Sequence, residues 1–243
     1  MSPLSHPSQV ARASARPAPG SYRDLPSGLD PVYARIYEAA LPMLQTRSND
    51  LHAEIGAQIV VELLHRDGGD LHIAVPAIIL HDLGWNEIPE ELQRSAFGPG
   101  SSNAELNRQH ELAGVRLARQ VLESVGYPAD LTAEILRIID GHDSRPEAST
   151  LEEAIVKDAD KMWRVTELGF PANLEMLETL TPQEFYGFIA VRAPAWFLAP
   201  SALQMARKYL EDRRVEYGLD PAPDIPPPPG FGIGDVEEYE HPR

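Results

Sequence analysis

The sequence predicts an all-α protein, in which helices pack as a bundle. Three observations predict it. Apolar residues recur every three or four positions between about residues 30 and 216, and this is the period of an amphipathic helix. The strict alternation of apolar and polar residues that marks a strand is not seen. Polar turn sequences such as Arg66-Asp67-Gly68-Gly69 divide the periodic stretch into segments of helix length.

Turn sequences and residues that commonly precede a helix predict where each helix begins. The first helix follows Asp30-Pro31, the second follows Asn49 and the third follows the turn at 66–69. Asn103 opens the fourth, and the turn 126–128 precedes the fifth. Thr150 opens the sixth, with Glu153 three residues later as its capping-box partner. We therefore expect helices at 31–46, 50–66, 72–84, 103–125, 129–142, 150–167, 181–191 and 195–216.

The two ends of the chain lack this helical period. The first 28 residues are rich in Ser, Pro, Ala and Arg, whereas the last 26 are rich in Pro and then in acidic residues. Such compositions do not form a packed core. We expect an irregular tail at 1–28, a helical domain at 29–217 and a Pro-rich acidic tail at 218–243. The prolines at 226–229 favour polyproline II, in a solvated tail or as a ligand for an aromatic groove.

Composition excludes several classes of function. The chain has no cysteine, so disulfides, thiolate metal sites and a cysteine nucleophile are excluded. Its formal net charge of −16 opposes binding to duplex nucleic acid and favours a small-molecule substrate. No apolar run reaches the roughly 18–20 residues of a membrane span, and the N-terminus lacks the apolar segment of a secretory signal. The expected location is cytoplasmic, with no membrane partner.

Three histidines stand where the helical pattern calls for apolar residues. His52 continues the apolar stripe of the second expected helix, His110 lies on the apolar face of the fourth, and His142 follows the apolar series of the fifth. A lone buried histidine is ordinarily a core residue with a satisfied hydrogen bond. Three such histidines on three separate helices instead indicate a shared site. Four others lie in tails or beside a polar turn and are expected to be solvated: His6, His65, His72 and His241.

The remaining histidine, His81, precedes Asp82 inside the apolar run 73–85. An unpaired carboxylate is very costly to bury in such surroundings. A divalent ion would keep the imidazole neutral and the carboxylate ionised, and two carboxylate oxygens allow Asp82 to bridge two ions. The alternative is a pairing of Asp82 with a buried Arg or Lys.

The order of these motifs resembles the HD-domain superfamily of metal-dependent phosphohydrolases over about residues 45–170. It consists of a helical His, an apolar run that ends in His-Asp-Leu-Gly, and a later Ala-Asp-Lys-Met at 159–162. The resemblance implies an HD-type helical bundle with additional C-terminal helices. It also implies that a first metal ion is bound by His52, His81, Asp82 and Asp160. Family members with two ions have two more histidines between these motifs.

His110 and His142 fit those two places, so the resemblance favours a dinuclear centre that Asp82 bridges. The last ligand has an alternative. On an ideal helix Asp158 lies nearer the apolar centre and Asp160 on its flank, so periodicity alone favours Asp158. The Ala-Asp pattern of the family favours Asp160, which we choose.

The sequence also departs from the patterns of particular subfamilies. HD-type cyclic dinucleotide phosphodiesterases resemble His-Asp-x-Gly-Lys, and nucleotidase-like members often have an acidic residue at the position of Trp85. Neither side chain is present here, which weakens both assignments. Trp85 is expected to form an apolar wall or to stack on a substrate ring.

The leading hypothesis is a phosphomonoesterase or phosphodiesterase that acts on a small phosphorylated metabolite or nucleotide. One or two divalent ions (Fe, Mn, Co, Mg or Zn) would activate water, with Asp82 at the reaction centre. Lys161 and Arg145 adjoin ligand segments and are candidates to hold the substrate phosphate, Lys161 also as a catalytic residue, although both fit surface charges as well. The segment 97–102 is either a lid or a connecting loop.

Two other functions stay open. The same six residues are similar to the ligand set of HD-type mixed-valence diiron oxygenases, which use O₂ to oxidise a C–H bond. A catalytically silent metal-binding regulatory module is the other alternative. The aromatic helices after residue 170 are expected to pack as core, and the alternatives are a substrate wall or the face of a homodimer.

Overall fold

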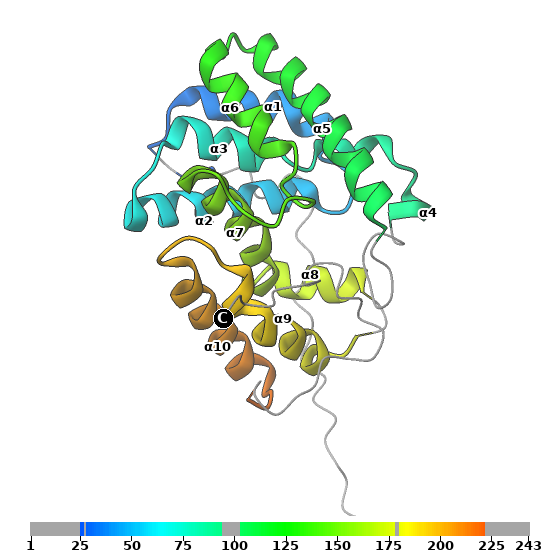
Figure 1. The fold of residues 1–243 in the computed structure, drawn as a ribbon. Helices are drawn as coiled ribbons and strands as arrows, with labels where there is room; N and C mark the ends of the chain where they lie inside the picture. Colours follow the sequence, from blue (N-terminus) through cyan, green and yellow to red (C-terminus); the bar gives the residue numbers. More distant parts are fainter. Residues whose placement is uncertain (1–24, 27, 94–102, 178–179, 222–243) are drawn as a thin grey trace, which may run out of the picture.

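The computed structural model describes residues 25–26, 28–93, 103–177 and 180–221. The predicted all-α class is confirmed, because the described part of the chain contains helices and no strand. Three short 3₁₀ helices are η1 (Leu41–Met43), η2 (Leu83–Glu87) and η4 (Trp163–Val165). The α-helices in Figure 1 are α1 (Pro31–Ala40), α2 (Asn49–Asp67), α3 (Leu71–Leu80), α4 (Glu90–Gln93), α5 (Ala104–Ser124), α6 (Ala129–Ile139), α7 (Leu151–Met162), α8 (Gly169–Met176), α9 (Pro182–Trp196) and α10 (Ala202–Tyr217).

The bundle is organised around α7. This helix packs against α2, α3 and α10, and all its residues from Glu153 to Asp160 are buried. Figure 1 shows α1, α3, α5 and α6 in the upper half of the view and α8, α9 and α10 in the lower half, with α7 between them. One cluster of buried apolar side chains extends from Tyr33 to Leu210. The C-terminal helices therefore share the core of the upper bundle.

Two of the three predicted start residues, Asn103 and Thr150, cap their helices, whereas Asn49 is the first residue of α2 and the cap before it, Ser48, makes no side-chain hydrogen bond. The side chains of Asp30, Asn103 and Thr150 accept hydrogen bonds from backbone N–H groups in the first turns of α1, α5 and α7. The predicted capping box at Thr150 is incomplete, because the Glu153 carboxylate accepts from the N–H of Ser149 instead. Such caps satisfy N–H groups that have no partner within the helix. The first helix is also shorter than expected, and a 3₁₀ turn that contains a proline follows it.

Both boundaries near the predicted metal ligands differ from expectation. The third helix ends at Leu80, so His81 is its C-cap and Asp82 lies in the following turn. The fifth expected helix ends at Ile139, and His142 follows Gly141, whose φ is 100°. Each histidine is therefore carried by the turn after a helix rather than by the helix itself.

Gly84 explains the first of these turns. A Cβ atom at this position would lie 1.8 Å from the carbonyl oxygen of His110, so only glycine permits η2 to pass so close to α5. This close approach, which belongs to the tertiary fold, brings the His81-Asp82 turn beside His110. The glycine of the His-Asp-Leu-Gly motif thus helps to assemble the site.

The C-terminal helices differ from the expected 181–191 and 195–216. The helix α9 continues through Pro194 to Trp196, and α10 begins only at Ala202. A proline inside a helix has no N–H to donate to the carbonyl oxygen four residues earlier, and α9 ends two residues after Pro194. The helix α8 was not expected at all. The aromatic residues behave as the predicted core, because those that are buried in the single chain are Phe185, Tyr186, Phe188, Trp196 and Phe197.

Candidate metal centre

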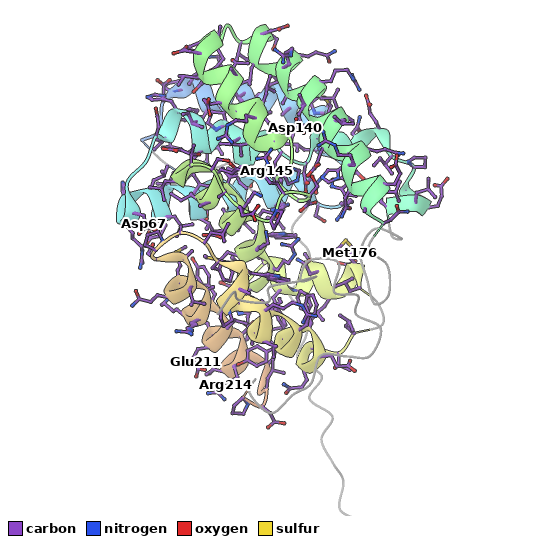
Figure 2. The ribbon with its side chains drawn as sticks, in the orientation of Figure 1. Asp67, Asp140, Arg145, Met176, Glu211 and Arg214 are labelled. Atoms are coloured by element: carbon purple, nitrogen blue, oxygen red, sulfur yellow. The ribbon has the colours of Figure 1, made fainter. Side chains whose placement is uncertain are left out.

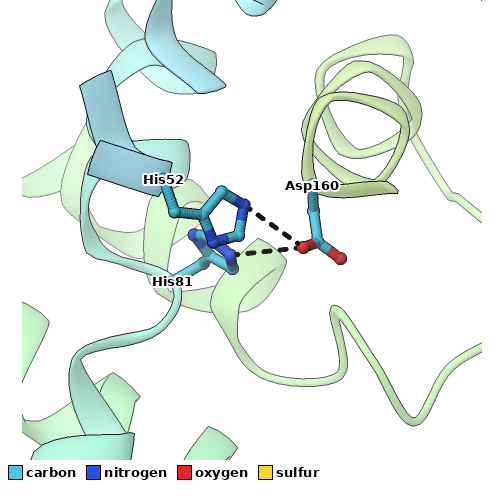
Figure 3. A group of neighbouring side chains, drawn as sticks. All are labelled: His52, His81 and Asp160. Atoms are coloured by element: carbon cyan, nitrogen blue, oxygen red, sulfur yellow. Dashed lines mark ion pairs between the residues drawn. The ribbon is translucent and has the colours of Figure 1, made fainter. Parts of the chain in front are cut away.

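The packing of α7 against α2 and α3 brings the first cluster of predicted ligands together. His52 comes from α2, His81 from the turn after α3, and Asp160 from α7. The Asp160 Oδ1 atom lies 3.5 Å from His52 Nε2 and 3.7 Å from His81 Nε2. Figure 3 shows both imidazoles facing this carboxylate across the gap between the helices. All three residues are buried.

A second cluster lies beside the first. It consists of His110 from α5 and of the consecutive residues His142 and Asp143 from the turn after α6. The Nε2 atoms of the two histidines are 3.2 Å apart. Asp143 Oδ2 lies 3.5 Å from His110 Nε2 and 3.8 Å from His142 Nε2. The sequence therefore supplies one donor here, Asp143, that the predicted ligand set did not include.

Asp82 lies between the two clusters. Its Oδ1 atom is 3.6 Å from His81 Nε2, 3.8 Å from His110 Nε2 and 3.6 Å from His142 Nε2. Its Oδ2 atom is 3.4 Å from His52 Nδ1. Donor atoms bound to one ion at about 2.0–2.2 Å lie roughly 3–3.6 Å from one another. The spacing of these donors fits divalent ions on both sides of the Asp82 carboxylate.

Two histidines are held in the orientation that metal binding requires. Nδ1 of His81 lies 2.8 Å from the carbonyl oxygen of Ile78, and Nδ1 of His142 lies 2.9 Å from that of Ile139. A carbonyl oxygen can only accept, so each Nδ1 carries a proton, and Nε2 is the ring atom directed to the cluster, where it can bind an ion. The Nε2 atoms of His52 and His81 are buried without a hydrogen-bond partner in the described structure. A metal ion would satisfy both.

The electrostatics of the site favour a cation. Burial acts to raise the pKa of Asp82, but the neighbouring His81, His142 and His52 outweigh it and hold this pKa well below its usual range. Burial likewise opposes protonation of His142, yet Asp143 and Asp82 raise its pKa to about 10. Protons are thus drawn to the site when it holds no ion. The donor set fits divalent metal ions, which would supply the same positive charge.

Two buried charged residues fix the turn that carries His142 and Asp143. Glu111 of α5 accepts hydrogen bonds from the N–H groups of Asp143 and Ser144 at 3.0 and 2.8 Å. From the other side, the Lys157 ammonium of α7 donates to the carbonyl oxygens of three residues in the same turn, namely Gly141, Arg145 and Glu147. Burial, assisted by Lys161, lowers the pKa of Lys157 to about 8. Helices α5 and α7 therefore position the second cluster.

In each cluster one histidine ring stacks on a tryptophan ring. The ring of Trp163 stacks on His52 with centroids 4.5 Å apart, and the ring of Trp85 stacks on His110 at 4.2 Å. Trp85 also donates from Nε1 to Asp82 Oδ1 at 3.1 Å. Trp85 is fully buried. It therefore lies within the protein as a support for two donors, and its buried ring is not exposed for a substrate to stack on.

The two predicted phosphate-binding residues have different surroundings. The Arg145 guanidinium donates to the carboxylate of Glu153 and to the carbonyl oxygen of Asp140. Figure 2 labels Arg145 and Asp140 close together in the upper half of the molecule. Lys161 follows Asp160 in the last turn of α7 and is half-buried. Its charge acts on Lys157 and Asp158.

Asp158 has a different set of partners from Asp160. Its carboxylate accepts from the N–H of Leu198 at 2.9 Å and from that of Ala199 at 2.7 Å. It therefore joins α7 to the segment between α9 and α10. Of the two aspartates that the sequence left as alternatives, the structure brings Asp160 to the histidines.

Sequence reasoning missed three residues around the site: Asp143, Glu111 and Arg47, whose guanidinium carbon lies 4.2 Å from the centroid of the Trp85 ring. Asp143 had a detectable signal, because His142 and Asp143 form a second His-Asp pair. Glu111 had a weaker one, as an acidic residue next to a predicted ligand. Arg47 lies in a short turn without periodicity.

Other predictions concerned residues away from the site. His65 and His72 are exposed, as expected. The remaining predictions fall on residues outside the described part of the chain, namely His6, His241, the segment 97–102 and the prolines at 226–229.

Comparison with known proteins identifies the domain that carries both clusters. Residues 49–164 match the family model of the HD domain, and this part of the chain is an HD domain. The match includes all six predicted ligands and also Asp143. No curated protein and no solved structure matches the chain. Among the described residues, no helix is long and apolar enough to cross a membrane.

The two aspartates of α7 should respond differently to replacement. We expect Asp160→Ala to lose metal from the first cluster, because a carboxylate donor is removed. We expect Asp158→Ala to retain metal but to lose about 2–3 kcal/mol of unfolding free energy, because two N–H groups lose their acceptor. Metal analysis and urea unfolding of both variants measure these effects. Loss of metal from Asp158→Ala, with metal retained by Asp160→Ala, would reverse the assignment.

Proposed function

We propose that this protein is a metal-dependent phosphohydrolase, a phosphomonoesterase or phosphodiesterase that acts on a small phosphorylated metabolite or nucleotide. The observation that carries the proposal is the pair of His/Asp clusters that share Asp82 within an HD domain. HD domains generally belong to hydrolases. The net charge of −16 also favours a small substrate over a nucleic-acid polymer.

The proposed ligands are His52, His81 and Asp160 on one ion and His110, His142 and Asp143 on the other, with Asp82 between them. Bound divalent ions supply an activated water and neutralise charge on the phosphate oxygens. The residues of the chain provide the rest. Asp82 stays ionised, the backbone carbonyl oxygens of Ile78 and Ile139 fix two imidazoles, and Glu111 holds the turn of the second cluster.

Release of phosphate from a panel of phosphomonoesters, phosphodiesters and nucleotides tests the proposal. The purified chain is loaded separately with Mn, Fe, Co, Mg or Zn and assayed with and without O₂. We expect hydrolysis of at least one ester that does not depend on O₂. Consumption of O₂ by the iron form without phosphate release would favour the oxygenase alternative. Inactivity of every metal form towards both reactions would favour the silent regulatory module.

A further inference from the structure

Arg164 is held beside the first cluster by the end of α7. It lies in η4, directly after Trp163, whose ring stacks on His52. Its Nη1 atom donates to the carbonyl oxygen of Asp160, in the last turn of α7, at 2.8 Å. A cation at the C-terminal end of a helix is also favoured by the helix dipole. The local fold therefore fixes where the Arg164 side chain lies.

The guanidinium is close to the carboxylate atom of Asp160 that faces the histidines. Nη1 of Arg164 lies 3.7 Å from Asp160 Oδ1. The same oxygen is 3.5 Å from His52 Nε2 and 3.7 Å from His81 Nε2. Donor atoms bound to one ion lie roughly 3–3.6 Å from one another. A substrate oxygen bound to the same ion as Asp160 would therefore lie within reach of the guanidinium.

Two of the three guanidinium nitrogens of Arg164 have no protein partner in the described part of the chain. The hydrogen bond and the ion pair to Asp160 both involve Nη1. Nε and Nη2 make no hydrogen bond there, and they are not among the buried unpaired atoms. The side chain is 21% exposed. By covalent geometry Nε and Nη2 share one planar edge of the group, and this edge matches two oxygens of a phosphate.

Two other cations near the second cluster have partners within the fold. Arg145 donates to the Glu153 carboxylate and to a backbone carbonyl oxygen. Lys157 donates to the carbonyl oxygens of three residues. Arg164 differs from both, because one whole edge of its guanidinium remains available to a ligand.

The charge of Arg164 acts on the first cluster. Burial acts to raise the pKa of Asp160, but Arg164, His81 and His52 outweigh it and hold this pKa well below its usual range. Arg164 also adds to the effect of burial in lowering the pKa of Arg47 to about 10. Two cations are thus near enough to repel each other at the site. An anion bound beside them would reduce this repulsion.

The charge balance supports an anionic ligand. Three carboxylates belong to the clusters, from Asp82, Asp143 and Asp160. Two divalent ions would bring four positive charges to them, and Arg164 adds one more. The loaded site would then carry an excess of positive charge, which a phosphate dianion would reduce.

We propose that Arg164 binds the phosphate group of the substrate through Nε and Nη2, beside the ion held by the first cluster. This inference rests on the proposed phosphohydrolase function and gives that function a substrate-binding residue. The planar edge of the guanidinium would contact two oxygens of the phosphate. A neutral substrate would lack this interaction, so Arg164 would select phosphorylated substrates.

Binding of inorganic phosphate to the metal-loaded full-length chain tests this role by calorimetry, without reference to turnover. We expect Arg164→Gln to weaken phosphate binding at least tenfold while metal content is unchanged, because glutamine can still donate to the Asp160 carbonyl oxygen but has no charge. Arg164→Lys should weaken binding at least threefold, because it keeps the charge but loses the planar pair of donors.

Arg214→Gln is the matched control. Arg214 lies in the last turn of α10, has a side chain that is 32% exposed and pairs with Glu211. Figure 2 labels both residues at the lower end of the molecule, far from Arg145 and Asp140. This variant should keep the phosphate affinity and the metal content of the wild type.

Phosphate affinity of Arg164→Gln or Arg164→Lys equal to that of the wild type would overturn the proposal. Loss of an ion from Arg164→Gln would also overturn it, because Arg164 would then serve to support Asp160. Two further results separate the proposal from the proposed function. Phosphate binding that depends on Arg164, in a protein that hydrolyses no ester, would preserve the subsite and contradict the hydrolase. Ester hydrolysis with the same KM in wild type and Arg164→Gln would contradict the subsite and preserve the hydrolase.

Discussion

Replacement of Asp82 by alanine is expected to reduce phosphoester hydrolysis by about three orders of magnitude or more. The carboxylate lies within 3.4–3.8 Å of donor atoms from four histidines in both clusters. Its loss should release the ions from both sides. Metal catalysis contributes several kcal/mol of transition-state stabilisation, and each 1.4 kcal/mol is a factor of ten in rate. Steady-state assays and metal analysis of the same preparation measure the effect.

Asp130→Ala is a suitable control for Asp82→Ala, because Asp130 is exposed in the first turn of α6. It should keep the metal content and the turnover of the wild type. Circular dichroism separates loss of metal from loss of fold in Asp82→Ala. An Asp82→Ala protein that keeps two ions and full activity would contradict the bridging role.

Replacement of Glu111 by alanine is expected to lower the unfolding free energy by about 3–5 kcal/mol, the cost of breaking a buried charged network. Glu111 is fully buried and accepts from two backbone N–H groups and from the Ser144 hydroxyl. Its removal leaves those donors without a partner. The turn with His142 and Asp143 should loosen, so metal at the second cluster should bind at least tenfold more weakly. Urea unfolding and metal titration measure the two effects.

Glu105→Ala is the matched control on the same helix, because Glu105 is exposed and pairs with Gln109 alone among the described contacts. Its unfolding free energy should change by less than about 0.5 kcal/mol. If Glu111→Ala were as stable as Glu105→Ala, the hydrogen bonds to the turn would not support the second cluster.

The sequence predicted the features that depend on local pattern. The helical class followed from the apolar period, and the caps at Asn103 and Thr150 followed from residue type. The His-Asp-Leu-Gly motif located the centre of the site. The predicted boundaries of the domain at 29–217 remain a prediction, since the family match covers 49–164.

Features that depend on packing were not predictable in the same way. The end of α3 at Leu80 depends on the contact between Gly84 and His110, which are far apart in the sequence. Periodicity alone favoured Asp158, whereas the structure brings Asp160 to the histidines; α7 is buried on every side along that stretch, so its apolar pattern does not single out the residue that faces the site. Residues in turns, such as Asp143 and Arg47, have no period to reveal them. Their places became evident only once the helices were assembled.

The metal content of the wild-type chain tests the central claim most directly. The protein is stripped with a chelator, reloaded separately with each of the five candidate metals, freed of excess ion and analysed by plasma mass spectrometry. We expect two ions per chain for at least one metal, with loss of both in Asp82→Ala. A folded wild-type chain that retains no ion of any of these metals would contradict a metal centre, and a chain that retains one ion would contradict the second cluster.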